Sequence, residues 1–247
     1  MKKIAIIIPS RLNALRLPNK PLKLINKKEM ILHVLDIAKS ANVGEVIVAT
    51  PDKKIIDIVS NHGGEAYLTD SLHQTGTDRI YEVFDKKFKK EMDVLINLQG
   101  DMPNIDPEDI KKLAEHMCRN LCDIGTLASK LNEKHNELFD KDVCKVVTNE
   151  GLEKNKFSSA VDFFRTSDKN TFKHVYHHIG IYGFTSKAIM KYVSLKRTKL
   201  ELGRRLEQMR ALENEMKIDV GFTESCPLSV DNEKDLNEIK IIMEKNE

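Results

Sequence analysis

Signatures of several common enzyme classes are missing from these 247 residues. No GxGxxG pattern follows the first apolar run, which argues against a nicotinamide dehydrogenase, and no GxxxxGK[ST] segment indicates a Walker-type triphosphatase. The chain also has no GxSxG segment, and no cysteine–histidine arrangement calls for a protein nucleophile. A reaction that runs by positioning, charge neutralisation and a metal therefore fits better than covalent catalysis.

The chain also has few cysteines, no long apolar run and little net charge. The four cysteines include no CxxC pair, so we expect free thiols and a reducing cytoplasm. The apolar run at residues 4–8 is too short for a signal peptide, and no later segment approaches a membrane span. A net charge of +2 is too small for a general nucleic-acid binder. We expect a globular protein with no membrane span and no nucleic-acid partner.

Apolar runs and helical patterns alternate along the first half of the chain. Strands are predicted at residues 4–8, 45–49 and 94–98, and helices at 30–42, 53–62 and from Pro107 onward. This alternation predicts an α/β fold whose mainly parallel sheet carries helices on both faces. Ligands are then expected beyond the carboxyl ends of the strands.

The second half is less regular, and no linker separates it from the first. Strands are predicted at 143–148, 156–159 and 175–184, and helices at 186–193, 199–214 and 232–245. The strands suggest an antiparallel insertion that suits dimer contacts or a second substrate. We expect one compact domain, residues 1–247, with two lobes.

The loop after the first predicted strand is basic. Arg11, Arg16 and Lys20 follow the strand directly, and a proline on either side of Lys20 stiffens the loop. An arginine fork matches phosphate oxygens, and such a turn presents its charge at the carboxyl edge of the sheet. A solvated basic loop is the alternative. The ligand that we expect is a polyanion, most simply a nucleoside triphosphate.

Two acidic residues are candidates for a metal site. Asp101 leaves the end of an apolar strand next to Gly100, and Asp231 precedes the last predicted helix. Mg²⁺ takes one or two protein carboxylates and fills its other positions with water and phosphate oxygens. Asp101 could instead be a turn residue, and Asp231 or Asn232 could be the N-cap of the helix.

Two polar segments stay ambiguous. Residues 74–79 open a helix in which hydroxyl groups around a glycine either cradle an anion or nucleobase edge, or cap the helix, with Thr77 as the cap. Glu207, Gln208 and Arg210 lie on the polar side of the helix predicted at 199–214, and the spacing of Glu207 and Arg210 is typical of a surface pair.

Three histidines lie close together at 174, 177 and 178. On a strand, His177 and His178 point to opposite faces, so they cannot easily share one metal ion. We expect one of them to face a ligand and the others to be solvated.

Seven segments, residues 9–22, 48–52, 74–79, 97–101 (NLQGD), 178–183 (HIGIYG), 206–210 (LEQMR) and 230–231, follow one another in an informative order. Together they closely resemble the 3-deoxy-manno-octulosonate (Kdo) cytidylyltransferase family over essentially the whole chain. The basic loop and the QGD segment are shared by sugar nucleotidyltransferases generally, whereas the segments at 74–79, 178–183 and 206–210 narrow the resemblance to this family.

The resemblance implies a Rossmann-like, mixed, mainly parallel sheet of the nucleotide-diphospho-sugar transferase type. It implies transfer of CMP from CTP to Kdo, giving CMP-Kdo and pyrophosphate with Mg²⁺, for lipopolysaccharide synthesis. A cytoplasmic homodimer is expected, with residues 143–215 contributing the sugar-binding and dimerisation lobe.

The resemblance also implies residue roles. The catalytic residues are Arg11, Arg16, Lys20 and Asp101, and the metal ligands are Asp101 and Asp231. The nucleotide-binding residues are Pro9, Ser10, Arg11, Arg16, Lys20, Asp52, Thr75, Gly76, Arg79 and Gln99. The sugar-binding residues are Gln99, His178, Tyr182, Glu207 and Gln208.

Departures from the family pattern cluster on the sugar side. Met102 stands where an acid is usual, Ser159 where an arginine is usual and Arg204 where an acid is usual, and residues 230–236 read VDNEKDL rather than VDTPEDL. The acceptor could therefore be 8-amino-Kdo or a nonulosonate. Two further readings are a non-catalytic CTP-binding relative and a nucleotide-sugar glycosyltransferase, although the latter typically shows an Asp-x-Asp that Asp101-Met-Pro does not fit.

Overall fold

The computed structural model describes residues 2–13, 16–119, 121–133, 136–166 and 172–245. The chain divides into two compact units, Met1–Ala114 with Pro227–Glu247 (unit 1) and Glu115–Cys226 (unit 2). The assignment of residues 1–247 to one nucleotidyltransferase domain, with a sugar-binding and dimerisation lobe at about 143–215, stays a prediction.

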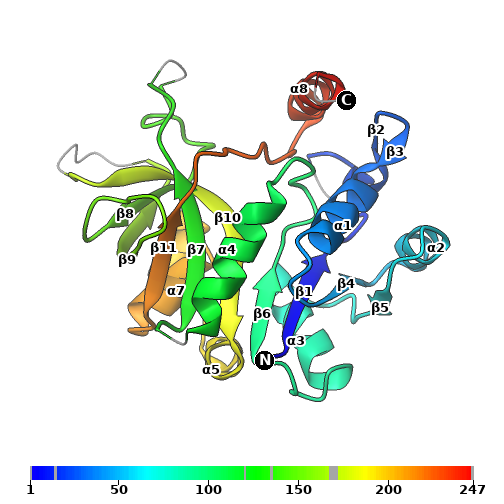
Figure 1. The fold of residues 1–247 in the computed structure, drawn as a ribbon, viewed down its shortest axis with the longest axis horizontal. Helices are drawn as coiled ribbons and strands as arrows, with labels where there is room; N and C mark the ends of the chain where they lie inside the picture. Colours follow the sequence, from blue (N-terminus) through cyan, green and yellow to red (C-terminus); the bar gives the residue numbers. More distant parts are fainter. Residues whose placement is uncertain (1, 14–15, 120, 134–135, 167–171, 246–247) are drawn as a thin grey trace. The chain divides into compact units, whose positions relative to one another are not determined.

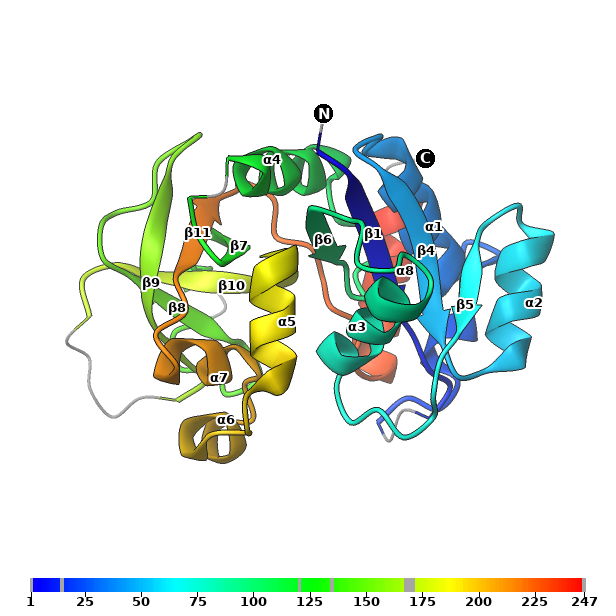
Figure 2. The ribbon, with the colours of Figure 1, turned by 90° about the horizontal axis from the view of Figure 1, so that it is seen from below.

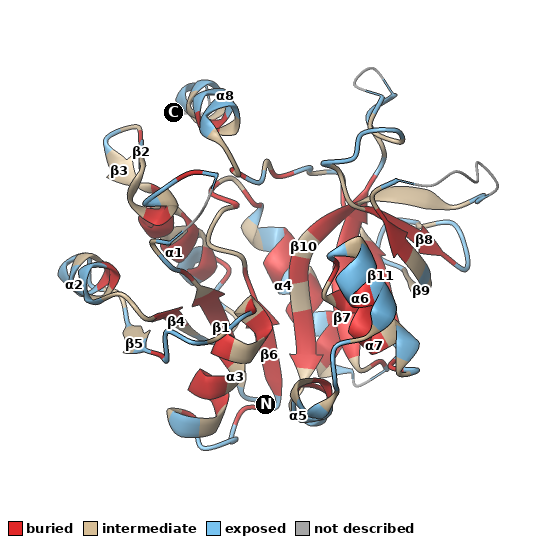
Figure 3. Cartoon of the chain, turned by 180° about the vertical axis from the view of Figure 1, so that it is seen from behind, coloured by how far each residue is buried: buried red, intermediate tan, exposed pale blue. Residues whose placement is uncertain are grey.

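Unit 1 is built on a parallel sheet in the order β5-β4-β1-β6. Its strands are β1 (Ile4–Pro9), β4 (Glu45–Thr50), β5 (Ala66–Leu68) and β6 (Val94–Asn97). The first, second and fourth confirm the predicted strands to within one residue at each end. They are near-continuous apolar runs because helices cover both faces of a parallel sheet, and the middle of β1 is fully buried (Figure 3).

Helices connect these strands and cover them. The helices are α1 (Met30–Ser40), α2 (Lys53–Asn61), α3 (Gly76–Lys86), α4 (Pro107–Cys118), which begins in unit 1 and ends in unit 2, and α8 (Glu233–Glu244). α1 and α2 connect strands outward from β1, whereas α3 leads back toward β6, and right-handed crossovers then place α3 on the other face. Figure 2 shows α3 in front of the unit 1 strands and α1 behind them.

The C-terminal segment returns to unit 1. Leu236 and Ile239 of α8 pack in one core cluster with Leu17, Ile25 and Met30. The short elements nearby are the 3-10 helix η1 (Lys20–Leu22) and the hairpin of β2 (Leu24–Ile25) and β3 (Lys28–Glu29). The basic loop is thereby held between the first strand and the last helix.

Among the described residues of unit 2, five strands form a closed circuit, because β10 pairs with both β7 and β8 (Figure 1). They are β7 (Ile124–Ser129), β8 (Lys145–Thr148), β9 (Phe157–Phe164), β10 (Val175–Thr185) and β11 (Ile218–Phe222). All pairings within the circuit are antiparallel except that of β7 with β11. The strands at β7 and β11 were not predicted.

The helix predicted at 199–214 is wrong, because the chain forms two short helices there. α5 (Ser186–Ser194) is followed by α6 (Lys199–Arg204) and α7 (Gln208–Glu213). Arg205 adopts a left-handed conformation with φ 55°, which ends α6. No helix in the described part of the chain is long and apolar enough to cross a membrane.

Candidate active site

Three of the predicted nucleotide residues, Pro9, Gly76 and Gln99, meet at the carboxyl edge of the unit 1 sheet. A Cβ atom on Gly76 would lie 3.3 Å from Pro9 Cγ and 3.8 Å from Gln99 Oε1. A Cβ atom on Gly100 would lie 3.2 Å from the Pro9 carbonyl oxygen. The ends of β1 and β6 and the start of α3 therefore approach closely, and glycine permits that approach.

The two predicted metal ligands converge on one ammonium group. Lys20 Nζ lies 2.7 Å from Asp101 Oδ2 and 3.2 Å from Asp231 Oδ1. Arg16 lies 2.9 Å from the second carboxylate oxygen of Asp231. Burial lowers the pKa of Lys20, but the nearby Asp101 and Asp231 carboxylates outweigh it, so its pKa is raised. The charges of two carboxylates and two cations thus gather at one strand edge.

The structure shows which residue caps α8, a role that the sequence left open between Asp231 and Asn232. Asn232, not Asp231, caps α8, and its side chain accepts hydrogen bonds from the Lys234 and Asp235 amides. Asp231 is therefore available for the cations, and the amide of Val230 donates to the Asp101 carbonyl at 2.9 Å. This backbone bond holds the two acidic segments side by side.

The start of the basic loop is anchored by Asp52, whose Oδ2 accepts a hydrogen bond from the Leu12 amide at 2.8 Å. Arg11 is exposed. The Ser10 hydroxyl is buried and makes no hydrogen bond with any described residue. A buried polar atom without a partner at a strand end is expected to find one in a ligand.

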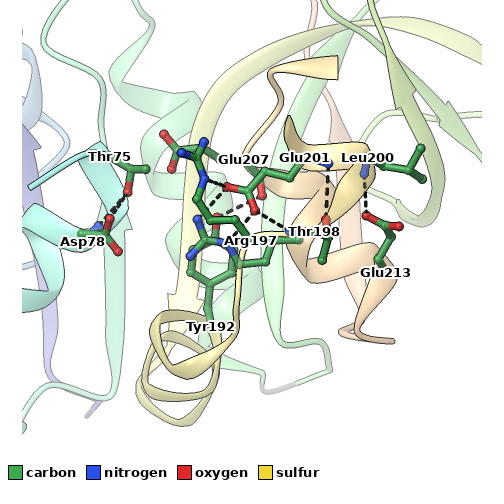
Figure 4. Close-up of polar contacts among 10 residues, drawn as sticks. Thr75, Asp78, Tyr192, Arg197, Thr198, Leu200, Glu201, Glu207 and Glu213 are labelled. Atoms are coloured by element: carbon green, nitrogen blue, oxygen red, sulfur yellow. Dashed lines mark hydrogen bonds and ion pairs between the residues drawn. The ribbon is translucent and has the colours of Figure 1, made fainter. Parts of the chain in front are cut away.

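The start of α3 differs from its prediction in the identity of the cap. Thr75 is the N-cap, and Figure 4 shows its hydroxyl beside Asp78, to which it donates at 2.8 Å. Thr77 is the second residue of α3 and lies inside the helix, so its assignment as the cap was wrong. Arg79 is buried, donates to Thr69 and to the Asp70 carbonyl, and its pKa is lowered by burial and by the charge of Arg11.

His178 lies on β10 in unit 2 and is buried. The Thr126 hydroxyl has one proton, which faces the carbonyls of Ile179 (3.2 Å) and Ile181 (2.7 Å), so His178 Nε2, 3.0 Å away, donates to Thr126. His178 Nδ1 is then an acceptor. Burial, with the charges of His177 and Arg165, lowers the pKa of His178 to about 3, so the ring is neutral.

The remaining sugar residues predicted in unit 2 gather near His178. The rings of His178 and Tyr182 have centroids 5.5 Å apart, where the pairing of β10 with β7 shifts register. Gln208 Nε2 lies 3.6 Å from the thiol of Cys144, and the Cys144 carbonyl accepts from the His178 amide at 2.9 Å. Burial raises the pKa of Tyr182, and Cys144 and Glu207 add to the effect. Cys144, which the sequence did not single out, is at the centre of this group.

The predicted surface pair of Glu207 and Arg210 is wrong. Arg210 is buried and pairs with buried Glu201, with Nη2 at 2.6 Å and Nε at 2.8 Å. Figure 4 shows Glu201 together with Arg197, whose Nε lies 2.9 Å from it, and Thr198, which caps α6. The capping box of Thr198 and Glu201 satisfies free amides at the start of α6.

Three of the four departures from the family pattern have partners or packing in this structure. Arg204 pairs with the Asp162 carboxylate and donates to the Phe163 carbonyl at 2.7 Å. The Ser159 hydroxyl lies 3.5 Å from Asp219 Oδ1, and Met102 is buried. Each of these three side chains is thus paired or packed within the fold.

The model of the cytidylyltransferase family matches residues 5–218. The chain belongs to this family. Among cytidylyltransferases, the 3-deoxy-manno-octulosonate cytidylyltransferases of Bartonella henselae and Brucella anthropi are each 39% identical to it. The match to the Bartonella protein covers 96% of this chain and 97% of that protein. The match to the Brucella protein covers 98% of this chain and 96% of that protein. The predicted family resemblance is confirmed.

Solved cytidylyltransferase structures agree with the fold. CMP:2-keto-3-deoxy-manno-octonic acid synthetase in complex with CTP superimposes with a TM-score of 0.87 and 32% identity, over 99% of this chain and 100% of that one. The 4-diphosphocytidyl-2C-methyl-D-erythritol synthase of Anaerococcus prevotii, at 14% identity and a TM-score of 0.65 over 98% and 99% of the two chains, shares the fold alone. The predicted mixed α/β nucleotidyltransferase fold is confirmed.

Proposed function

We propose that this cytidylyltransferase transfers CMP from CTP to Kdo and releases pyrophosphate. The observation that carries the proposal is the meeting of Lys20, Arg16, Asp101 and Asp231 at one strand edge, in a chain whose relatives are named for this reaction. The anomeric oxygen of the sugar forms a bond to the α-phosphorus as the bond from that phosphorus to the bridging oxygen breaks. CMP-Kdo then serves lipopolysaccharide synthesis.

The residues of unit 1 bind the nucleotide in this proposal. Arg11, Arg16 and Lys20 neutralise the triphosphate, and the buried Ser10 hydroxyl gains a phosphate oxygen as its partner. The rest of the nucleotide site consists of Pro9, Asp52, Thr75, Gly76, Arg79 and Gln99. Arg79 positions its neighbours in this site, since its guanidinium already donates hydrogen bonds to the Thr69 hydroxyl and the Asp70 carbonyl.

Asp101 and Asp231 fit a magnesium ion. Their oxygens both lie within 3.2 Å of the Lys20 nitrogen, so an ammonium already takes the place of a cation between them. Two carboxylates with water and phosphate oxygens are the donor set that Mg²⁺ prefers. When bound, the ion neutralises charge on the transferring phosphoryl group. Lys20 is then free to turn toward the phosphates.

The residues of unit 2 bind the sugar acid. The Nδ1 atom of neutral His178 accepts a hydrogen bond from a sugar hydroxyl. Polar contacts are added by Tyr182, Glu207 and Gln208, and by Gln99 of unit 1. Arg165 supplies a positive charge near this group, since its charge helps to lower the pKa of His178 and opposes the rise that burial causes in the pKa of Cys144. That charge suits the carboxylate of a keto-acid sugar.

A homodimer and a cytoplasmic location complete the proposal. The four cysteines are free thiols, which suits a reducing compartment. Light scattering across a concentration series tests the dimer, and a stable monomer at all concentrations would refute it.

Pyrophosphate release tests the function directly. Each of CTP, UTP, ATP and GTP is combined with Kdo, 8-amino-Kdo and a nonulosonate, with and without Mg²⁺. We expect release with CTP and Kdo only when Mg²⁺ is present. Release with another nucleotide alone would overturn the cytidine assignment, and a preference for another sugar would replace the acceptor. CTP binding without turnover on any sugar would favour a non-catalytic relative.

A further inference from the structure

Unit 2 contains two clusters of metal-ligating side chains that the proposed reaction does not use. The surface cluster is Glu137, His177 and Cys226, and the buried cluster is His116, Cys122 and Asp219. In each cluster one imidazole nitrogen, one thiol sulfur and one carboxylate oxygen lie within 4.8 Å of one another. The elements that carry them are far apart in sequence, so tertiary structure assembles both.

Two donor atoms of the surface cluster lie near the same nitrogen of the third residue, His177. His177 Nδ1 lies 3.0 Å from Glu137 Oε2 and 3.8 Å from Cys226 Sγ. In a nucleophilic cysteine–histidine–carboxylate triad, the thiol and the carboxylate contact opposite ring nitrogens. Here both contact the same nitrogen, so the arrangement does not suit a proton relay. It suits three donors around one cation.

The distances match those of a tetrahedral zinc site. Bond lengths of about 2.0–2.1 Å to nitrogen or oxygen and about 2.3 Å to sulfur place tetrahedral ligand atoms about 3.4–3.6 Å apart. The observed separations of 3.0 and 3.8 Å differ from these by a few tenths of an ångström. The third separation, between the Glu137 and Cys226 donors, is at most 4.8 Å. An ion bound here therefore requires side-chain rotations and no rearrangement of the backbone.

Ser129 lies beside the surface cluster. It is the register partner of His177 in the pairing of β7 with β10, so the two side chains lie on the same face. The buried Ser129 hydroxyl is close enough to Cys226 to interact with its thiol. An outer polar partner of this kind is what a metal ligand usually has.

The buried cluster has similar distances but already forms a closed network. His116 Nε2 lies 3.0 Å from Asp219 Oδ2, and the Lys217 ammonium lies 3.6 Å from Asp219 Oδ1. The ring of Phe157 stacks on His116 at 3.6 Å. Burial, with the charge of Asp219, raises the pKa of the Cys122 thiol to about 12. A nearby cation, close packing and a protonated thiol all disfavour a metal ion there.

The thiol of the surface cluster is accessible, since Cys226 is exposed and an ion can reach it. Thiolate, imidazole and carboxylate together are a donor set for zinc rather than for magnesium.

We propose that Glu137, His177 and Cys226 form a binding site for Zn²⁺ or a similar borderline-soft divalent cation, with an open fourth position for water. His177 and His178 project from opposite faces of β10, so this site lies away from the predicted sugar residues. The two histidines do not share an ion. One of them instead joins a carboxylate and a thiol from distant segments of the chain.

Cobalt binding tests the site spectroscopically. The chelator-treated protein is titrated with Co²⁺ in excess Mg²⁺, which occupies oxygen-only sites but competes poorly for a thiolate. We expect one equivalent to bind with thiolate-to-cobalt charge-transfer absorption, and Zn²⁺ to displace it. Changing an outer partner of a metal site costs about 10–100-fold in affinity, so loss of a direct ligand in Cys226→Ser or His177→Gln should weaken Zn²⁺ binding by at least about 100-fold.

Two cysteine variants serve as controls. Cys118→Ser removes a thiol outside both clusters and should leave the cobalt spectrum unchanged. Cys122→Ser removes the thiol of the buried cluster and should also leave it unchanged. Absence of a thiolate band in the unmodified protein would overturn the proposal. So would a band that survives Cys226→Ser and disappears in Cys122→Ser.

Discussion

Lys20 joins two carboxylates that lie 81 and 211 residues away from it in the sequence. Each of these side chains is partly buried, so the three charges depend on one another for compensation. In the proposed reaction, a triphosphate draws Lys20 away and a divalent cation takes its place between the two acids. Single substitutions here separate the metal role from the fold.

Asp101→Asn tests the metal role of Asp101. We expect kcat to fall by at least about 100-fold, because a lost electrostatic contact to the transition state typically costs about 2.7–4 kcal/mol. Steady-state kinetics at saturating Mg²⁺ measure this, with Asp57→Asn on the exposed face of α2 as the control and thermal unfolding as the check on folding. Near-normal turnover would make Asp101 a turn residue only.

His178 predicts a pH dependence of stability. Its pKa is lowered to about 3 in the folded protein, mainly by burial, from an ordinary value of 6.5. Below pH 6.5 the unfolded chain therefore binds a proton that the folded chain does not. As the pH is lowered from 6.5 to about 3, this group decreases the free energy of unfolding by about 1.4 kcal/mol per pH unit. Stability from His178 is thus retained above pH 6.5.

Urea unfolding of His178→Gln between pH 7 and 5 measures this dependence. The variant should lose less stability than the unmodified protein over that range, and the difference in slope should approach the value above. His174→Gln, which changes a half-buried imidazole next to β10, is the control. Parallel curves for His178→Gln and the unmodified protein would show that His178 titrates normally in the fold.

At the scale of elements, the predicted sugar residues lie at the start of α7, where Glu207 is the N-cap and Gln208 is the first helical residue. The helices α6 and α7 are joined by the buried pair of Glu201 and Arg210 and by the left-handed Arg205 between them. The Tyr192 hydroxyl of α5 donates to the Glu207 carbonyl at 2.9 Å, so α5 also fixes this turn. The position of Glu207 thus depends on groups that do not themselves face a sugar.

Glu201→Gln should therefore act on the sugar through structure. Removing one partner of a buried ion pair typically costs about 3–5 kcal/mol, because the remaining charge is left uncompensated. We expect a lower free energy of unfolding and a raised KM for Kdo, with the KM for CTP unchanged. Glu213→Gln changes an exposed acid on α7 and is the matched control. An equal rise of both KM values would mean that the damage is not confined to unit 2.

At the scale of the whole molecule, the two predicted substrate sites belong to different units. The phosphate and metal candidates are in unit 1, including the returning segment at Asp231, and all sugar candidates except Gln99 are in unit 2. The proposed reaction therefore needs both units. Each substrate should slow hydrogen exchange in a different set of residues.

Hydrogen exchange with each substrate alone tests this division. CTP should slow exchange near residues 9–20, 75–79 and 98–101, because ligand binding raises the free energy of local opening. Kdo should slow exchange around Cys144, His178 and Glu207. Mass spectrometry of peptides resolves these regions, and peptides of α2 serve as an internal reference. Protection by Kdo confined to unit 1 would contradict the sugar assignment.

Much of the fold was predictable because buried strands and helices show local patterns of apolar residues in the sequence. β1, β4 and β6 are short apolar runs, and α1, α2 and α8 show helical spacing with ends that polar or small residues mark. The order of seven polar segments was enough to identify the family. Each of these signals lies within a few consecutive residues.

Errors arose where the decisive partner was distant. The helix at 199–214 breaks at Arg205, and Arg210 turns inward because Glu201 is buried beside it. β7 and β11 went unpredicted, although β7 is buried along its whole length, since its glycine and hydroxyl residues weaken the apolar pattern. Amphipathic spacing alone cannot show that a charged side chain has a buried counter-ion.

The sequence by itself therefore determined the main strands, most helices and the family, because these depend on periodicity and on motifs read along the chain. Only the tertiary structure decided that Lys20 lies between Asp101 and Asp231 and that Glu137, His177 and Cys226 meet at one nitrogen. Such convergence depends on strand order and register, which bring distant residues to one edge or one face. No local pattern encodes either of these.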